Sequence, residues 1–200
     1  MITNNGNLIC SCDVETTGLD PEDHEVWQLA CIPLTFNLTQ DKTRPVLELF
    51  IRPSVLDTMP HEELAMTAKQ IELVDKTGFS PEEAIEQFNR WQEKLKLQEG
   101  RRIIPLAQNW KFDHQYMQKL LGYEHYNYLF DGLHRDTLQV ALFINDVAEF
   151  MGEPVPFSRT TLVVLCQKLG VELDNAHDAL ADSYAVIEVY RKLIEMVELL

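Results

Sequence analysis

Three segments in the first quarter of the chain carry the hydrophobic pattern of β-strands. Residues 8–14 are mostly apolar, residues 26–38 alternate in part between apolar and polar side chains, and residues 46–51 are again mostly apolar. Such segments, bounded by turn residues, are typical of strands. We therefore predict three strands here. Because the connections between them are short, we expect antiparallel pairing.

From residue 60 onward, apolar positions recur every three or four residues, which indicates helices. We predict a short helix that begins near Pro60 and is broken near Gly78. A second helix is predicted to begin at Ser80, because serine can cap a helix and Glu83 completes a capping box. We expect this helix to end at residues 99–100.

The rest of the chain is predicted to alternate strands with helices. A strand at residues 103–107 contains Pro105, although proline weakens a central strand. The remaining predicted elements are a helix from Asn109 to Gly122, an irregular segment at 123–133, a short strand at 133–136, and helices at 137–150, 158–169 and 176–197. This order indicates an α/β fold with a mixed sheet flanked by helices.

Length and composition are those of one globular domain. The chain has 200 residues, 46% of them hydrophobic, which suffices for a sizeable core, and no stretch has the composition of a linker. We therefore expect residues 1–200 to form a single domain. No signal-peptide core and no apolar stretch of membrane-spanning length is present, so we expect a cytoplasmic protein without membrane contact.

The net charge restricts the kind of nucleic acid that this chain could bind. It is −15, from 32 acidic residues against 17 lysines and arginines. Proteins that grip long duplexes by neutralising phosphates are basic, so the charge argues against that mode of binding. It is compatible with an enzyme that holds a few terminal nucleotides through metal ions.

Two acidic residues lie at the end of the first predicted strand, on the same face. Side chains alternate along a strand, so Asp13 and Glu15 point the same way and repel each other. A hard divalent cation such as Mg²⁺ or Mn²⁺ would relieve that repulsion. Taken alone, the pair is more typical of a strand that becomes acidic where it reaches the surface. Gly18 then turns the chain and is free to adopt a positive φ.

Two later stretches add further acids and a histidine. Asp113 lies in the first turn of a predicted helix, where the helix dipole favours an acid even without a metal. His177 and Asp182 are five residues apart, so on one helix they would diverge by about 140°. They converge only if His177 lies in the loop before the helix. Spacing alone leaves Asp178 as an alternative to Asp182.

Three motifs resemble those of the DnaQ-like 3′→5′ exonucleases of the DEDDh group, in the ribonuclease-H-like superfamily. They are Asp-Val-Glu-Thr-Thr-Gly-Leu at residues 13–19, Asn-Trp-Lys-Phe-Asp at 109–113 and His-Asp-Ala-Leu-Ala-Asp at 177–182. Their order and separation span nearly the whole chain. The resemblance implies a ribonuclease-H-like fold with a five-stranded mixed sheet.

The resemblance also implies a catalytic apparatus of two divalent metal ions, Mg²⁺ or Mn²⁺. Asp13 would bridge both ions, Glu15 and Asp182 would bind the first, and Asp113 would complete the cluster. His177 would be the general base, since a histidine can accept a proton at neutral pH. Asp178 would begin the helix. The reaction implied is two-metal hydrolysis of phosphodiesters to 5′-mononucleotides.

Residues around the first two motifs are candidates for contact with the terminal nucleotide. The resemblance implies Val14, Thr16, Thr17, Leu19 and Phe112. Phe112 could stack on a base or serve as a core residue at helical spacing.

One departure and one further agreement qualify the resemblance. The His-Gly-Ile element found in many relatives is missing, since residues 68–71 are Ala-Lys-Gln-Ile. Residues 136–138, Asp-Thr-Leu, match a segment of the family in which the aspartate is structural.

The leading hypothesis is therefore a 3′→5′ exonuclease acting on single-stranded DNA or RNA 3′ ends. DNA is preferred over RNA because residues 15–18 resemble the proofreading group. A polymerase or other replication protein is a possible partner. The rival hypothesis is a non-catalytic, polymerase-associated or nucleic-acid-binding domain on the same fold, but all five residues of catalytic type are present.

Overall fold

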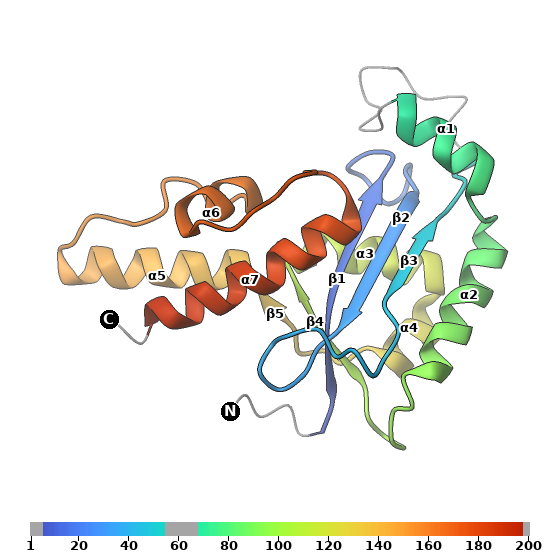
Figure 1. Ribbon diagram of the computed structural model, residues 1–200, viewed down its shortest axis with the longest axis horizontal. Coiled ribbons are helices and arrows are strands. Elements are labelled where there is room, and N and C mark those ends of the chain that lie inside the picture. The colour runs from blue at the N-terminus through green and yellow to red at the C-terminus, as the bar shows by residue number, and fades with distance from the viewer. Residues whose placement is uncertain (1–5, 55–67, 198–200) are drawn as a thin grey trace.

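A mixed five-stranded sheet forms the centre of the protein. The computed structural model describes residues 6–54 and 68–197. The strands are β1 (Leu8–Thr16), β2 (Val26–Pro33), β3 (Leu47–Phe50), β4 (Ile103–Ala107) and β5 (Arg135–Asp136). Their order is β3-β2-β1-β4-β5, with β2 antiparallel to β1 and β3, and with β1, β4 and β5 parallel. The expected antiparallel start and mixed sheet are thus confirmed, and β1 is central (Figure 1).

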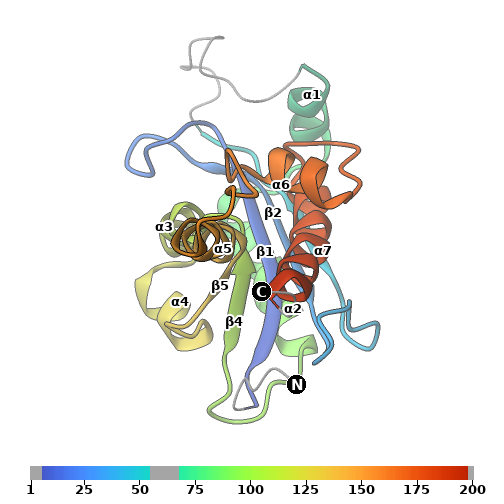
Figure 2. The same ribbon diagram turned by 90° about the vertical axis from the view of Figure 1, so that its left-hand side faces the viewer.

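Helices cover both faces of the sheet. They are α1 (Ala68–Thr77), α2 (Pro81–Lys94), α3 (Trp110–Leu121), α4 (Tyr123–Leu129), α5 (Thr137–Met151), α6 (Leu162–Leu169) and α7 (Ala179–Val197). Figure 2 shows the sheet on edge, with α3 and α4 on one side and α6 and α7 on the other. The predicted α/β class, with helices flanking the sheet, is confirmed.

The alternation of side chains along β1 decides which helices each residue meets. Its even-numbered residues, from Leu8 to Val14, pack with α2, α3 and α4. Its odd-numbered residues face the other layer: Ile9 packs with α5, α6 and α7, and the hydroxyl of Ser11 donates to the carbonyl of Ser183 at 2.9 Å. Asp13 and Glu15 continue this odd-numbered series, so they point toward the start of α7.

Pro105 is accommodated in β4 although this strand lies between two others. The backbone groups of successive residues in a strand point alternately to its two neighbours. The carbonyls of Ile103 and Ala107 accept bonds from Asp131 and Thr137, on the β5 side. The backbone nitrogen of Pro105, which has no hydrogen to donate, therefore also points toward β5. There β5 pairs only with Leu106 and Ala107. No ladder hydrogen bond is lost at the proline.

The start of α2 has the capping box that the sequence predicts. The Ser80 hydroxyl accepts the Glu83 N–H at 3.2 Å, and the Glu83 carboxylate accepts the Ser80 N–H at 2.8 Å.

We expect Ser80→Ala to lower the free energy of unfolding by about 1 kcal/mol, or about 2–4 °C in Tm. Thermal unfolding would measure this. Ser158→Ala, at an exposed serine, is the matched control and should leave Tm unchanged, and an equal loss in both variants would contradict the capping role.

Two segments differ from the prediction. β2 ends at Pro33 rather than residue 38, because the chain folds back in a turn closed by the Thr35 N–H bonding to the Thr39 carbonyl at 2.8 Å. Leu38 is buried within that turn at φ 56°. Residues 123–129, expected to be irregular, form α4, whose Tyr126 stacks on Phe130 with ring centroids 4.8 Å apart. Two aromatic residues of this segment, Tyr123 and Tyr128, are exposed, and they hid its helical spacing.

Smaller corrections concern the ends of helices and strands. β1 extends two residues beyond its predicted end, β3 and β5 are shorter than expected, and α5 runs one residue longer. α6 begins at Leu162 rather than residue 158, and α7 begins at Ala179 rather than residue 176. α1 occupies the later part of the predicted short helix, whose first part lies outside the described residues.

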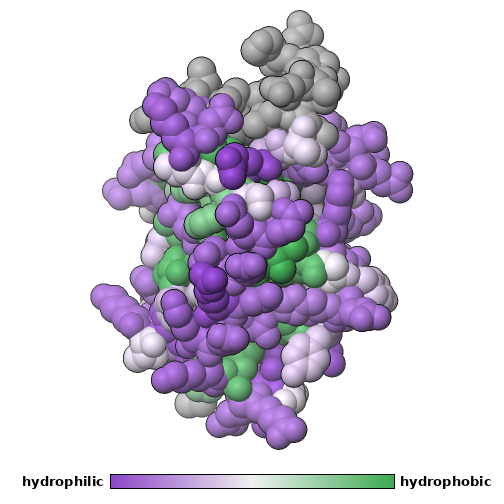
Figure 3. Space-filling view, turned by 90° about the vertical axis from the view of Figure 1, so that its right-hand side faces the viewer, coloured by the Kyte–Doolittle hydropathy of each residue, from purple (hydrophilic) through white to green (hydrophobic). Residues whose placement is uncertain are grey.

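Polar side chains dominate one face of the protein. The face that carries α1 and α2 is mainly hydrophilic, with small hydrophobic areas between the polar side chains (Figure 3). Within residues 6–54 and 68–197, no helix is both long and apolar enough to cross a membrane.

Candidate active site

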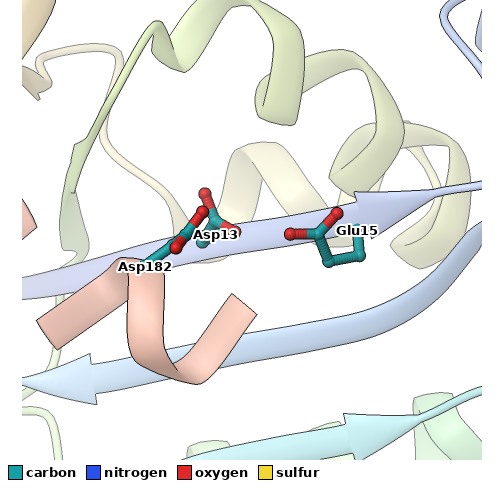
Figure 4. Close-up of side chains that lie close together, drawn as sticks. All are labelled: Asp13, Glu15 and Asp182. Atoms are coloured by element: carbon teal, nitrogen blue, oxygen red, sulfur yellow. The ribbon is translucent and has the colours of Figure 1, made fainter. Parts of the chain in front are cut away.

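Three carboxylates converge where β1 ends and α7 begins. One carboxylate oxygen from each of Asp13, Glu15 and Asp182 lies within 4.8 Å of the others (Figure 4). All three side chains are half-buried. The first two come from the central strand and the third from the first turn of α7. Residues that are far apart in the sequence thus form one acidic cluster.

The N-terminal cap of α7 determines where Asp182 lies. The Asp178 carboxylate accepts the Ala181 N–H at 2.9 Å, and the Asp178 carbonyl accepts the Asp182 N–H at 2.8 Å. An aspartate that accepts a backbone N–H three residues ahead is a typical helix cap. Asp178 therefore begins the helix, as the resemblance implied, and Asp182 joins the other two acids.

His177 lies in the turn that precedes α7, not on the helix. Its backbone is left-handed, with φ 68°, and its carbonyl accepts the Gln70 side-chain amide at 3.3 Å. The condition for convergence with Asp182 is therefore met. Burial raises the pKa of Asp182, and a backbone bond and the charge of His177 oppose that shift. The imidazole itself is exposed to solvent. A proton acceptor in this position can be reached by water and by substrate.

Asp113 lies beside the cluster but has a backbone partner of its own. It is buried at the start of α3, and its Oδ1 accepts the Val14 N–H at 3.1 Å. Among neighbouring charges, that of Asp113 contributes most to raising the pKa of Asp13. Its ligand atoms are not within the 4.8 Å group formed by the other three acids. The structure therefore brings together three of the four predicted metal-binding acids and places the fourth next to them.

Burial raises the pKa values of all four carboxyl groups, and repulsion from a neighbouring acid adds to each shift. Burial raises the pKa of Glu15 to about 8, and the nearby Asp182 adds to this shift. The pKa of Asp113 is raised by burial to about 8, although the Val14 N–H opposes the shift. Burial likewise raises the pKa of Asp182 to about 6, and Asp13 is shifted well upward by burial and by the other acids. No lysine or arginine of the described residues contributes to the pKa shifts of these four acids, so their negative charge is not offset by a basic side chain.

The acidic cluster suits a divalent cation. Buried carboxylate oxygens normally have hydrogen-bond partners, but Oδ1 of Asp182 has none among the described residues. Oxygen ligands from several carboxylates are those that Mg²⁺ and Mn²⁺ prefer. A bound cation would satisfy the unpaired oxygen and offset the repulsion that raises the pKa values.

These shifts predict how the metal-free protein responds to pH. Carboxyl groups whose pKa is higher in the folded state bind more protons when folded, so stability falls as pH rises between the ordinary and the raised values. With EDTA present, we expect Tm to fall as the pH rises from about 5 to 8. Each kcal/mol lost from the free energy of unfolding should lower Tm by about 2–4 °C. With Mg²⁺ the fall should largely disappear. Thermal unfolding at both pH values tests this, and a metal-free Tm that rises toward pH 8 would contradict it.

The turn after β1 uses most of its polar groups internally. The Thr16 hydroxyl donates to the Gly18 carbonyl at 2.6 Å, and the Thr17 hydroxyl, fully buried, accepts the Glu25 N–H at 3.0 Å. Gly18 does not take the positive φ that we expected. A Cβ added at Gly18 would lie 2.4 Å from the His24 ring, so a larger residue here would require that ring to move.

Of the predicted substrate-binding residues, Leu19 and Phe112 have the most accessible side chains. Leu19 is 84% exposed, and Phe112 is half-buried with its ring 5.0 Å from that of Tyr116. α3 anchors the loop that carries Leu19. The Tyr116 hydroxyl donates to the Gly18 carbonyl at 2.8 Å, and the Lys119 ammonium donates to the carbonyls of Pro21 and His24 at 2.7 and 3.1 Å. Val14, in contrast, is buried, and its N–H bonds to Asp113.

Of two buried polar residues near the cluster, the sequence predicted the role of one and not of the other. Asp136 accepts the N–H groups of Asn109 and Trp110 at 2.9 and 3.0 Å, which fixes the start of α3, so its structural role was anticipated. Gln28 was not identified from the sequence. Its only signal is a polar residue inside the otherwise apolar strand β2, yet its side chain contacts the start of α7.

Comparison with known proteins gives a family match over most of the chain. The profile of the RNase_T family, described as Exonuclease, matches residues 11–190. A curated relative is the PolC-type DNA polymerase III of Staphylococcus saprophyticus subsp. saprophyticus, with 28% identity over 194 residues. That match covers 94% of this chain but 11% of the polymerase, so the chain corresponds to a small part of that protein.

Solved exonuclease structures share the fold. Exonuclease I from Methylocaldum szegediense has a TM-score of 0.69 at 24% identity, covering 94% of this chain and 40% of its own. The nuclease domain of 3′hExo, a DEDDh family member bound to rAMP, has a TM-score of 0.69 at 16% identity, covering 98% and 95%. Exonuclease I from E. coli, in complex with a dT13 oligonucleotide, has a TM-score of 0.67 at 18% identity, covering 96% and 43%.

These findings agree with the resemblance inferred from the three motifs. The profile begins at Ser11, just before the first acidic pair, and ends at Tyr190, within α7, so it includes every residue of the acidic cluster. The five-stranded mixed sheet is the one that the resemblance implied. The chain belongs to the RNase_T exonuclease family, the DnaQ-like exonucleases of the ribonuclease-H-like superfamily.

Proposed function

We propose that residues 1–200 form one exonuclease domain that degrades single-stranded nucleic acid from its 3′ end and releases 5′-mononucleotides. The observation that carries this proposal is the convergence of Asp13, Glu15 and Asp182 within 4.8 Å, with one buried oxygen left unpaired among the described residues. Membership of an exonuclease family supports the reaction class.

The acids would hold two divalent cations, Mg²⁺ or Mn²⁺. Asp13, Glu15 and Asp182 supply the shared ligand cluster, and Asp113 is the candidate fourth ligand at its edge. Cations held in this way lower the pKa of a bound water and stabilise negative charge on the leaving oxygen. The protein's part is to keep the carboxylates close despite their repulsion, which burial between β1 and α7 achieves.

His177 is proposed as the general base. Its place in an exposed turn, close enough to influence Asp182, lets the imidazole accept a proton from the attacking water and pass it to solvent. Leu19 and Phe112 are proposed to contact the terminal nucleotide, because both present apolar surface near the end of β1. Val14, Thr16 and Thr17 would act mainly by shaping this turn.

Single-stranded DNA is the proposed substrate, with RNA as the competing possibility. The net charge of −15 disfavours long duplexes, and the fold is shared with an exonuclease I that is in complex with a dT13 oligonucleotide. The similarity to part of a PolC-type DNA polymerase supports DNA over RNA and makes a polymerase or another replication protein a candidate partner. The 3′hExo domain bound to rAMP is the reason to test RNA alongside.

The test uses 5′-labelled single strands of DNA and RNA with one sequence, incubated with Mg²⁺, Mn²⁺ or EDTA. We expect a ladder that shortens from the 3′ end, requires the metal and is faster on DNA. Asp182→Ala should produce no ladder. If the folded wild-type protein cleaves neither strand with either metal, the exonuclease proposal fails and a non-catalytic nucleic-acid-binding domain becomes the better account.

A further inference from the structure

A buried glutamine lies beside the acidic cluster and takes no part in the proposed chemistry. Gln28 is on β2, where every other residue is also buried, and its exposed fraction is 0%. It is the register partner of Glu15 on β1, so the two side chains lie next to each other on the face covered by α7. Burying an amide is costly unless its donor and acceptor groups both find partners.

The Gln28 amide finds its partners at the start of α7 and on β3. Its Oε1 accepts the Ala179 N–H at 3.2 Å. Its Nε2 lies 3.4 Å from the Asp178 carboxylate and 3.2 Å from the Glu48 carboxylate. A single side chain therefore contacts both the cap of α7 and its first residue, 150 positions away in the sequence.

These contacts provide hydrogen-bond partners for backbone N–H groups at the start of α7 that have none within the helix. The first N–H groups of a helix have no partner within the helix, and Ala179 is the first helical residue. Asp178 uses its other carboxylate oxygen to cap Ala181, so the bond from Gln28 also orients the cap. The N–H of Asp182 bonds to the Asp178 carbonyl, and His177 directly precedes Asp178.

We propose that Gln28 is a positioning residue that sets where α7 begins, and so places Asp182 and His177 relative to Asp13 and Glu15. Figure 4 shows the start of α7 lying over β1 and β2, where this connection acts. The left-handed backbone conformation of His177 is unfavourable by itself and persists only where neighbouring contacts hold it. The Gln28 contacts hold the two residues that follow His177. The inference rests on the proposed function, because it assigns Gln28 a role in the same site.

The test compares Gln28→Met with Ser11→Ala. Methionine keeps the length of the side chain but removes both hydrogen-bonding groups. Ser11→Ala instead removes a buried bond from β1 to Ser183, in the second turn of α7, and leaves the contacts of Asp178 and Ala179 in place. Calorimetric titration with Mn²⁺ measures metal affinity without relying on nuclease activity. We expect affinity about 10-fold to 100-fold lower in Gln28→Met and unchanged in Ser11→Ala. For oligonucleotide cleavage, kcat should fall in Gln28→Met with KM unchanged.

Amide hydrogen exchange measures the protection of the Ala179 N–H directly, first in the wild-type protein and then in the two variants. The Ala179 amide should be strongly protected, and its exchange should be at least about 10-fold faster in Gln28→Met but not in Ser11→Ala. Equal losses of Mn²⁺ affinity in the two variants, or an unprotected Ala179 amide in the wild type, would overturn the proposal. If the wild type bound Mn²⁺ and protected Ala179 but cleaved nothing, the proposed function would fail while the positioning role stood.

Discussion

Asp13→Asn is expected to lower kcat by about 10³-fold, equivalent to ~4 kcal/mol of lost transition-state stabilisation. Asp13 is the member of the acidic cluster proposed to contact both cations, and it lies on the central strand. Asparagine preserves the size of the side chain but removes the charge that offsets a divalent ion. Single-turnover cleavage of a 5′-labelled strand at saturating Mg²⁺ would measure the loss.

The same substitution should stabilise the metal-free protein, which separates loss of function from damage to the fold. The pKa of Asp13 is raised well above its usual range by burial and by the charges of Asp113, Glu15 and Asp182, so its charged form is unfavourable without metal. With EDTA at pH 8, Tm should rise in Asp13→Asn, and the gain in Tm on adding Mg²⁺ should shrink. Asp146→Asn, at an exposed aspartate on α5, is the matched control and should change neither kcat nor Tm. A fall in metal-free Tm together with the loss of activity would indicate misfolding instead.

His177→Asn is expected to lower kcat by about 10²–10⁴-fold, the usual contribution of a positioned general base. Mn²⁺ affinity should stay close to that of the wild type, because His177 is not proposed as a ligand. Asparagine tolerates the left-handed backbone that His177 adopts, so the turn before α7 should be preserved. The measurement is kcat as a function of pH, with Mn²⁺ binding followed by calorimetry.

The control for His177 is another exposed histidine. His134 lies directly before β5, and His134→Asn should retain full activity. An unchanged kcat in His177→Asn would remove this residue from the mechanism and leave proton transfer to solvent. Lost Mn²⁺ binding in His177→Asn would instead indicate that the turn itself had been disturbed.

Local chemistry explains which parts of the fold the sequence predicts well. The alternation along β1 assigns its residues to the two faces, because a strand offers only two directions for a side chain. The start of α2 follows from Ser80, Pro81 and Glu83, which satisfy the first N–H groups of the helix by themselves. In both cases the determining interactions lie within a few residues of each other.

The parts that the sequence could not determine depend on contacts between distant segments. Whether Asp178 or Asp182 joins the cluster depends on where α7 begins, and Gln28, on another strand, contacts that point. A glutamine in an apolar strand signals a buried polar contact but does not identify its partner. Pro105 was ambiguous for a similar reason, since its acceptability depends on how few residues β5 pairs with β4.

The most direct measurement of the central claim is anomalous diffraction from crystals soaked in MnCl₂. The account predicts two peaks about 3.5–4 Å apart. One should be contacted by Asp13, Glu15 and Asp182, and the other by Asp13 on the side of Asp113. Density without a peak at these carboxylates, in crystals whose soak holds Mn²⁺ well above millimolar concentration, would contradict the metal site and with it the proposed mechanism.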